Sequence, residues 1–186
     1  MSYSAKVLAD SISPDGVRLT TMEVTFPRIV LAEFNTHRMF SRNSASSRAI
    51  PVEKMIQRVL DDPFSPVWWG KNQSGMQAAE ELSGEALRLA RQHWLDARDF
   101  AISCVRLFQA PEISLHKQIA NRLLEPFLWH TVVVTATEWE NFFALRCHKD
   151  APARDPRHCG DDARSASQQR ATCRRLRRVA FAARRR

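Results

Sequence analysis

The sequence has few of the features that mark fibrous, membrane-spanning or disulfide-rich proteins. Only five glycines and nine prolines occur in 186 residues, which is too few for a low-complexity chain. No apolar run approaches the roughly 18 residues that a membrane helix requires, and no secretory signal pattern opens the chain. The four cysteines show no CxxC pair and no metal-ligand spacing, so we expect reduced thiols in a cytoplasmic protein, and no metal site.

Lysine and glutamate are both absent from residues 152–186. This tail contains 11 arginines and three aspartates, whereas residues 1–151 contain 17 basic and 17 acidic side chains. The tail therefore accounts for the whole net charge of +8 and is the cause of the pI near 10. We expect the body to be neutral and the tail to attract nucleic acid only non-specifically.

Hydrophobic periodicity predicts a single α+β domain, dominated by helices, with a small antiparallel sheet. Residues 17–19 and 22–26 alternate apolar and polar side chains after an Asp-Gly turn, and residues 131–135 read as a buried strand containing three valines. Residues 28–34 fit either an extended or a helical state. Residues 62–73 read as a loop that carries two tryptophans.

Four helices are expected in the second part of the body. Pro51 is suited to the start of a helix over residues 52–61. Apolar side chains spaced by three and four predict a long helix from about residue 77 to 108. Ser114 is expected to cap a helix that runs to about residue 124 and is stopped by Pro126, and a capping box at residues 137–140 opens a helix to about residue 147.

Between residues 33 and 48 the chain concentrates groups that can bind an anion. These sixteen residues include three arginines, one histidine, two asparagines and four serines. Arginine forks bind phosphate bidentately, and hydroxyls with free backbone N–H groups can complete an anion site. The composition alone fits a solvated polar loop equally well. Neither GxxxxGK[ST] nor GxGxxG occurs, so the common nucleotide-binding loops are absent.

The spacing within this segment resembles the signature of flavin-dependent thymidylate synthases, RHRxxSxNxxSxR. The matching positions are His37, Arg38, Ser41, Asn43, Ser46 and Arg48, with Thr36 in place of the first arginine and Ser44 where many members carry glutamate. Further matches follow in order at residues 69–77, 121–126 and 139–146. The resemblance covers roughly residues 15–151, and its departures are similar to a phage or actinobacterial branch.

The resemblance implies a cytoplasmic homotetramer of a bacterium or a phage-infected host, with FAD at the subunit interfaces. It implies reductive methylation of dUMP to dTMP, with methylenetetrahydrofolate as the one-carbon donor and NADPH as the source of hydride. The flavin contacts that it implies are Thr36, His37, Arg38, Ser44 and Arg146. The nucleotide contacts that it implies are Glu33, Ser44, Ala45, Ser46, Ser47, Arg48 and Arg122, with Arg48 on the phosphate. Arg122 would also fit a surface charge, and Arg146 a partner of its helix dipole.

Residues 152–186 depart from the C-terminus that is usual in this family. Members continue from Leu-Arg to Ala-Gln-Pro-Glu-Ile-Arg and an amphipathic helix, whereas Ala151 is followed here by the arginine-rich run. A shifted reading frame over residues 153–157 permits Pro-Glu-Ile-Arg, and the same frame over residues 178–184 permits the family's usual ending. We therefore expect the domain of residues 1–151 to be C-terminally incomplete, and the tail to be out of frame and disordered.

This departure leaves the activity of the chain open. No catalytic residue is assigned, and Arg157 is the nearest counterpart of the arginine that is thought to polarise the uracil in the family. Two alternatives to an active enzyme follow from the tail. One is an inactive flavoprotein remnant, and the other is a nucleic-acid-binding protein that acts through the basic tail.

Overall fold

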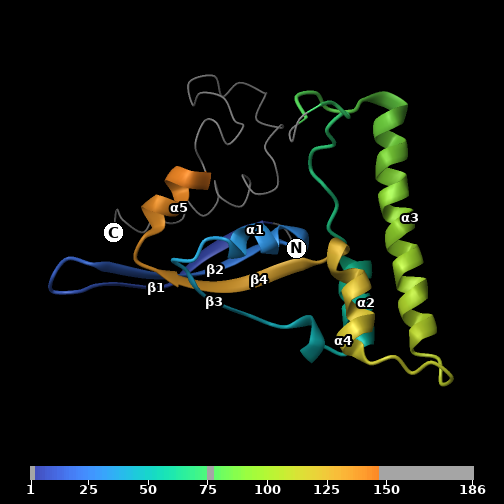
Figure 1. Cartoon of the computed structure of the whole chain (residues 1–186), viewed down its shortest axis with the longest axis horizontal. Helices are drawn as coiled ribbons and strands as arrows, with labels where there is room; N and C mark the ends of the chain where they lie inside the picture. The colour runs from blue at the N-terminus through green and yellow to red at the C-terminus, as the bar shows by residue number, and fades with distance from the viewer. Residues whose placement is uncertain (1–2, 75–77, 147–186) are drawn as a thin grey trace.

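The computed structural model describes residues 3–74 and 78–146 (Figure 1). Its strands are β1 (Ser4–Ile12), β2 (Arg18–Pro27), β3 (Ser41–Ser44) and β4 (Trp129–Ala136). Its α-helices are α1 (Leu31–Asn35), α2 (Val52–Asp61), α3 (Gly84–Phe108), α4 (Lys117–Ala120) and α5 (Trp139–Arg146), and its 3-10 turns are η1 (Arg28–Val30), η2 (Ser47–Ala49) and η3 (Asn121–Phe127). The expected α+β class is confirmed. The arginine-rich tail and Arg157 lie outside the described residues.

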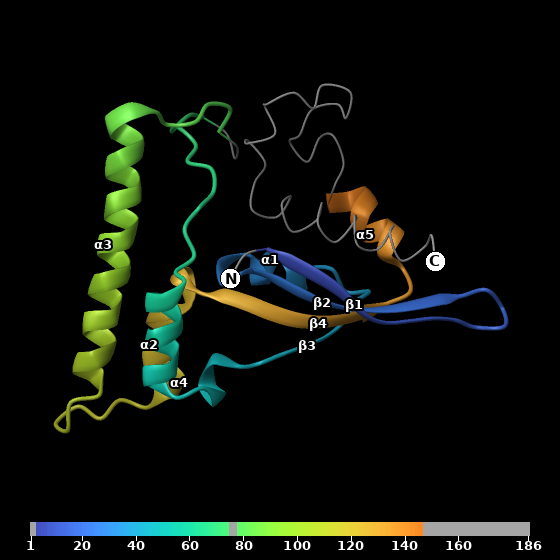
Figure 2. The ribbon, with the colours of Figure 1, turned by 180° about the vertical axis from the view of Figure 1, so that it is seen from behind.

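The strands form one antiparallel sheet in the order β1-β2-β4-β3. Val132 and Val134 of β4 are buried, but Val133 between them is 37% exposed. The prediction of a strand here is confirmed, but the strand is not buried throughout: among the described residues, α1 and α5 lie on the same side of the sheet (Figure 1), and Val133 points away from the core. Figure 2, in which the molecule is seen from behind, shows α1 and α5 on the same side of the sheet.

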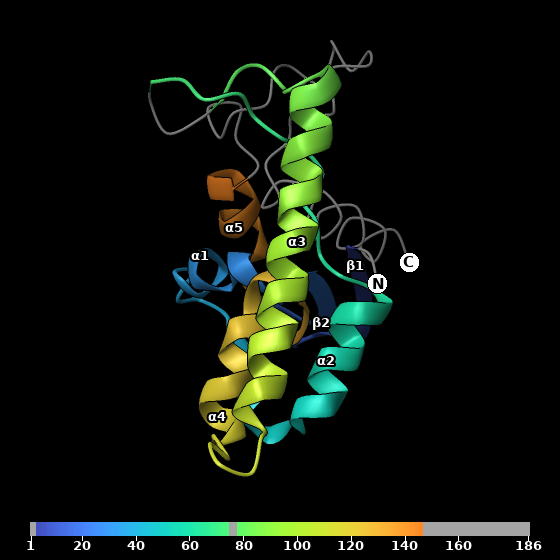
Figure 3. The same ribbon diagram turned by 90° about the vertical axis from the view of Figure 1, so that its right-hand side faces the viewer.

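Two hydrophobic cores meet at β4. The sheet core joins β2 and β4 to aromatic side chains of α1 and α5, including Phe34 and Phe142. The helical core joins α2, α3, α4 and η3 through residues such as Ile56, Val105 and Leu124, which are fully buried. Figure 3 shows these helices side by side at one end of the sheet.

The long helix begins later than its periodicity suggested. It starts at Gly84 and not near residue 77, because the preceding segment is held in an extended form. The backbone N–H of Leu82 donates to the Trp69 carbonyl at 2.8 Å, and that of Lys71 donates to the Glu80 carbonyl at 2.8 Å. These bonds fold the tryptophan-bearing loop back on itself, and hydrogen bonds made across a loop outweigh the local helix preference.

The prediction that Ser114 caps a helix is wrong. Ser114 adopts a positive φ of 44°, and its N–H donates to the Ala110 carbonyl at 2.8 Å. The helix starts three residues later at Lys117, where the Nδ1 atom of His116 accepts from the N–H of Gln118 at 3.2 Å. Pro126 lies inside η3 and does not end it. Helix α2, in contrast, has the bounds expected from Pro51, which occupies its N-cap position.

Candidate functional site

Residues 44–50 lead from the edge of the sheet to the helical core. β3 pairs with β4 from Ser41↔Thr135 to Ser44↔Val132, and the chain then leaves the sheet edge. The Ser46 hydroxyl accepts from the N–H of Arg48 at 3.3 Å and so caps the single turn η2. Hydroxyls are favoured at such positions because they satisfy N–H groups that a short turn leaves unpaired. We call residues 44–50 the serine loop.

The side chain of Arg42 fixes the backbone of residues 34–37, which precede this loop. Arg42 Nη1 lies within hydrogen-bond distance of the carbonyls of Phe34 at 3.4 Å, Asn35 at 3.1 Å and His37 at 2.9 Å. These carbonyls lie at and just beyond the C-terminal end of α1, where carbonyl groups have no partner within the helix. Arg42 therefore fixes the bend that carries the motif from α1 to β3.

A row of polar side chains from α4 and η3 faces the serine loop. Asn121 is fully buried, and its Nδ2 atom donates to the Ser47 carbonyl at 2.8 Å and to the Ile50 carbonyl at 2.9 Å. Lys117 Nζ donates to the Ala49 carbonyl at 3.4 Å. The loop backbone is thus bound by side chains that lie more than sixty residues later in the chain.

Glu125 joins the serine loop to two arginines through a single oxygen. Its Oε1 atom accepts from Ser47 Oγ at 3.1 Å and from Arg28 Nη2 at 3.2 Å, and it lies 3.5 Å from Arg122 Nη1. The side chains of Arg28 and Glu125 are 19% and 21% exposed, so their attraction is less screened than that of a surface pair. This arrangement places Arg122, expected as a nucleotide contact, beside Ser47 of the same predicted set.

His130 completes this polar cluster at the start of β4. Its Nε2 atom lies 3.2 Å from Arg28 Nη1 and must accept that hydrogen bond, because a guanidinium has no acceptor. Burial, and then the nearby charge of Arg28, lower the pKa of His130 to about 4, against a smaller opposing effect of Glu125. His130 is therefore neutral at pH 7.

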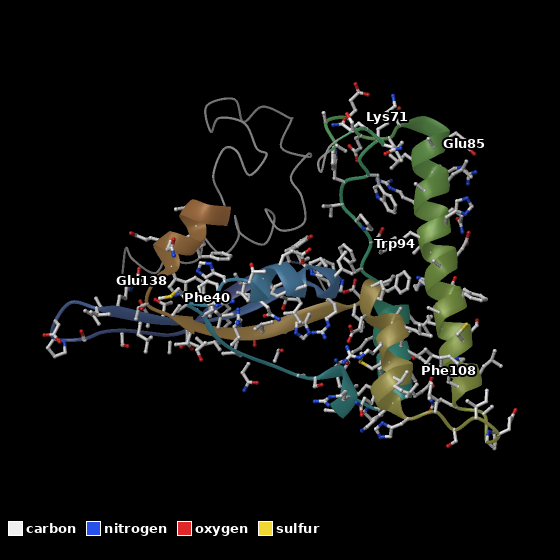
Figure 4. The ribbon with its side chains drawn as sticks, viewed as in Figure 1. Phe40, Lys71, Glu85, Trp94, Phe108 and Glu138 are labelled. Carbon is white, nitrogen blue, oxygen red and sulfur yellow. The ribbon has the colours of Figure 1, made fainter. Side chains whose placement is uncertain are left out.

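The residues expected to bind flavin lie outside the polar cluster around Glu125, and they differ from one another in burial. His37 is buried, and its ring centroid lies 4.5 Å from that of Phe40 and 5.1 Å from that of Phe142. Phe40, labelled in Figure 4, lies between the sheet and α5. The adjacent Arg38 is exposed, as is Thr36, whose Oγ1 donates to the backbone carbonyl of Glu33 at 2.7 Å. Ser44 is exposed at the end of β3, and the side chain of Arg146 lies outside the described residues.

The residues expected to bind the nucleotide are contiguous and mostly exposed. Ser44, Ala45, Ser46 and Arg48 are exposed in the serine loop, whereas Ser47 is buried against Glu125. Glu33 lies on α1 at the other end of β3 and is exposed. Within the described residues the Arg48 guanidinium makes no hydrogen bond or ion pair, so it is available to an anion.

Five residues of this site were not predicted from the sequence as binding residues: Arg28, Lys117, Asn121, Glu125 and His130. One signal in the sequence does point to part of the set, because Lys117, Asn121 and Glu125 recur every four residues, the spacing that shares one face of an α-helix. In the structure the segment is α-helical only to Ala120 and continues as the 3-10 turn η3. Arg28 and His130 carry no comparable signal, since only the pairing of β2 with β4 brings them together.

Lys117 also lines a cavity of about 640 Å³ between the first turn of α2 and the connection from α3 to α4. Glu53, Ser114 and His116 contribute to its walls, and none of the predicted site residues does. Within the described ranges no group of three or more His, Cys, Asp or Glu side chains is placed to hold a metal ion. No helix in the described part of the chain is long and apolar enough to cross a membrane.

No family model and no curated protein matches the chain. Among solved structures, a UMP/dUMP methylase, PolB from Streptomyces cacaoi, bound with 5-Br UMP, is similar with a TM-score of 0.64 and 14% identity, over 97% of this chain and 88% of that chain. The same methylase bound with 5-Br dUMP is similar with a TM-score of 0.56 and 15% identity, over 89% of this chain and 65% of that chain. At these identities the likeness concerns the arrangement of helices and strands, and the chain shares that fold.

Proposed function

We propose that this chain binds a uridine monophosphate nucleotide and acts as a flavin-dependent thymidylate synthase, converting dUMP to dTMP. The observation that carries the proposal is the serine loop, whose backbone is held by Asn121 and whose Ser47 hydroxyl is held by Glu125. The loop presents exposed hydroxyls and Arg48, whose guanidinium has no partner among the described residues. The likeness to a methylase named for UMP and dUMP supports the same class of substrate.

The charges around the serine loop suit a phosphate dianion. Arg28, Arg48, Lys117 and Arg122 lie in or beside the loop, and Glu125 is the carboxylate that contacts two of them. The side chain of Arg122 is 58% exposed and so remains accessible to a ligand. Because hydrogen bonds from guanidinium to phosphate are among the stronger ones in proteins, Arg48 and Arg122 are the proposed phosphate ligands.

Arg38, which lies before the loop, and Ser44, the first residue of the loop, fit an anionic cofactor such as FAD. Arg38 is exposed and has no hydrogen-bond or ion-pair partner in the part of the chain that the structure describes, and the Ser44 hydroxyl is exposed nearby in sequence. We propose that Arg38 and Ser44 hold the cofactor, with Thr36, His37 and Arg146 as further contacts. His37, buried against Phe40, supports the backbone from which Arg38 projects. When bound, the flavin supplies the redox chemistry, with NADPH and methylenetetrahydrofolate as co-substrates.

We further propose that the chain self-associates, as a homotetramer. On α3, Phe100 is 73% exposed and Leu107 is 64% exposed, and Ile119 of α4 is 59% exposed. Large apolar side chains left exposed on a helix, as Phe100 and Leu107 are on α3, can mark interfaces between chains. A single protomer would then carry only part of each site.

The test is calorimetric titration of the purified chain with dUMP and with UMP, with and without added FAD. We expect dUMP to bind, added FAD to be retained with absorbance near ~450 nm, and Arg48→Ala to weaken nucleotide binding tenfold or more. Arg58→Ala is the matched control, because Arg58 is an exposed arginine of α2 outside the site. The proposal would be contradicted if the parent protein binds neither nucleotide. If the parent binds UMP more tightly than dUMP, the proposed reaction becomes methylation of the ribonucleotide and not of dUMP.

A further inference from the structure

The serine loop has little structure of its own. Its internal backbone hydrogen bonds are those of one 3-10 turn, from Ala49 N–H to the Ser46 carbonyl at 3.0 Å and from Ile50 N–H to the Ser47 carbonyl at 3.4 Å. A single turn of this kind is marginal in water, because nucleating a helix fixes several dihedral angles for one hydrogen bond. The shape of the loop must therefore be imposed from outside.

Three side chains of the α4–η3 segment impose it. Lys117 and Asn121 bind the backbone of the loop, at the carbonyls of residues 47, 49 and 50. Glu125 differs from them, because it binds the Ser47 hydroxyl and is the member that also contacts Arg28 and Arg122. Arg28 follows β2 directly, so Glu125 links the loop to the sheet as well as to the helical core.

We propose that Glu125 is a positioning residue, which holds residues 44–48 in the nucleotide-binding shape through Ser47 and does not itself bind the nucleotide. This inference rests on the proposed function. The Oε1 atom of Glu125 already accepts from Ser47 Oγ and Arg28, with Arg122 alongside, and neither oxygen of a carboxylate can donate a hydrogen bond to a phosphate. The same Oε1 atom lies 3.5 Å from Arg122 Nη1 and so keeps Arg122 beside Ser47 of the loop.

The proposal predicts that removing Glu125 weakens nucleotide binding, whereas electrostatics alone predicts that it tightens binding. The two explanations can therefore be told apart by experiment. A carboxylate beside a phosphate site repels the phosphate, so removing Glu125 would tighten nucleotide binding if its charge were all that mattered. If its hydrogen bonds matter more, removal loosens the loop and weakens binding, since a disordered loop must be ordered again when the ligand binds. The conservative change Glu125→Gln separates the two effects, because it removes the charge and keeps an acceptor for Ser47.

The experiment compares Glu125→Ala, Glu125→Gln and Ser47→Ala in the full chain. Amide hydrogen exchange of residues 44–50 and calorimetric dUMP affinity are measured, and Glu112→Ala serves as the control because Glu112 is exposed in the α3–α4 connection. We expect Glu125→Ala to speed exchange in the loop and to weaken dUMP binding about tenfold or more, while Glu125→Gln stays within about threefold of the parent. Ser47→Ala should speed exchange likewise, with no further effect when it is combined with Glu125→Ala.

Unchanged exchange in the loop of Glu125→Ala, or dUMP binding as tight as in the parent, would overturn the proposal. A failure of the proposed function is a separate result, seen when the parent itself binds neither nucleotide. In that case exchange alone decides whether Glu125 holds the loop. Should Glu125→Ala fail to fold, Ser47→Ala carries the same test, because it breaks the same contact and leaves the ion pairs of Glu125 in place.

Discussion

Lowering the pH from 7 to 5 should destabilise the protein through His130. The imidazole is buried, and its Nε2 atom accepts a hydrogen bond from Arg28. Burial disfavours the charged imidazolium, and protonation would also place a second cation beside the guanidinium, so the pKa of His130 falls to about 4. In the unfolded chain a histidine has its ordinary pKa of about 6.5.

The sign and size follow from proton linkage. Between pH 6.5 and pH 4 the unfolded chain binds a proton at residue 130 that the folded chain does not, so stability falls as the pH falls through this window. At pH 5 the difference amounts to about 2 kcal/mol, and it approaches about 3 kcal/mol at pH 4. Such a loss is a large fraction of the stability of an ordinary domain.

Urea unfolding followed by tryptophan fluorescence at pH 7 and pH 5 measures this loss. The variant His130→Gln cannot take up the proton and still offers Arg28 an acceptor, so its stability should fall about 2 kcal/mol less over the same range. His93→Gln is the control, because His93 is an exposed residue of α3 and the variant should keep the behaviour of the parent. Equal losses of stability in the parent and in His130→Gln would refute the reasoning.

Three substitutions test the packing around the site. Phe40→Ala should lower the free energy of unfolding by about 3–5 kcal/mol in urea denaturation, because Phe40 is 5% exposed and packs on His37; a loss below about 1 kcal/mol would mean that the cluster is not packed as described. Trp94→Phe should cost about 1 kcal/mol in the same assay, because the indole N–H of Trp94 donates to the Phe64 carbonyl at 2.9 Å, and an unchanged midpoint would count against that bond. Arg42→Lys should speed amide exchange over residues 35–40, since a lysine cannot reproduce the reach of Arg42 Nη1 to three carbonyls, and parent-like exchange would contradict this.

Much of the fold could be predicted because its elements carry local patterns. The alternation around Met22 and Val24 marks β2, and Pro51 marks the start of α2. The predictions failed where contacts across a loop prevail over local preference, as at Ser114, whose N–H turns back to Ala110. Strand β1 escaped prediction because Ser4–Ile12 lies at the edge of the sheet, where mostly exposed side chains leave a weak pattern.

The candidate site could be predicted only in part, for a related reason. The exposed serines and Arg48 lie within one short segment, so their density is visible in the sequence. The residues that hold the loop are far apart in the sequence, because Arg28 precedes the loop and Glu125 follows it by more than seventy residues. The register of β2 with β4, in which Phe26 faces His130, brings Arg28 beside His130. Glu125 then joins Arg28 to Ser47 of the loop.

The order of strands in the sheet bears on how the chain acquires its fold during synthesis. β4 lies between β2 and β3, and its residues from Trp129 to Ala136 pair with strands completed more than eighty residues earlier. Until Ala136 has left the ribosome, the β1–β2 hairpin and β3 have no central strand to join. Non-local pairing of this kind folds slowly, so the nascent chain exposes Met22, Val24 and Phe26 to other proteins for most of its translation.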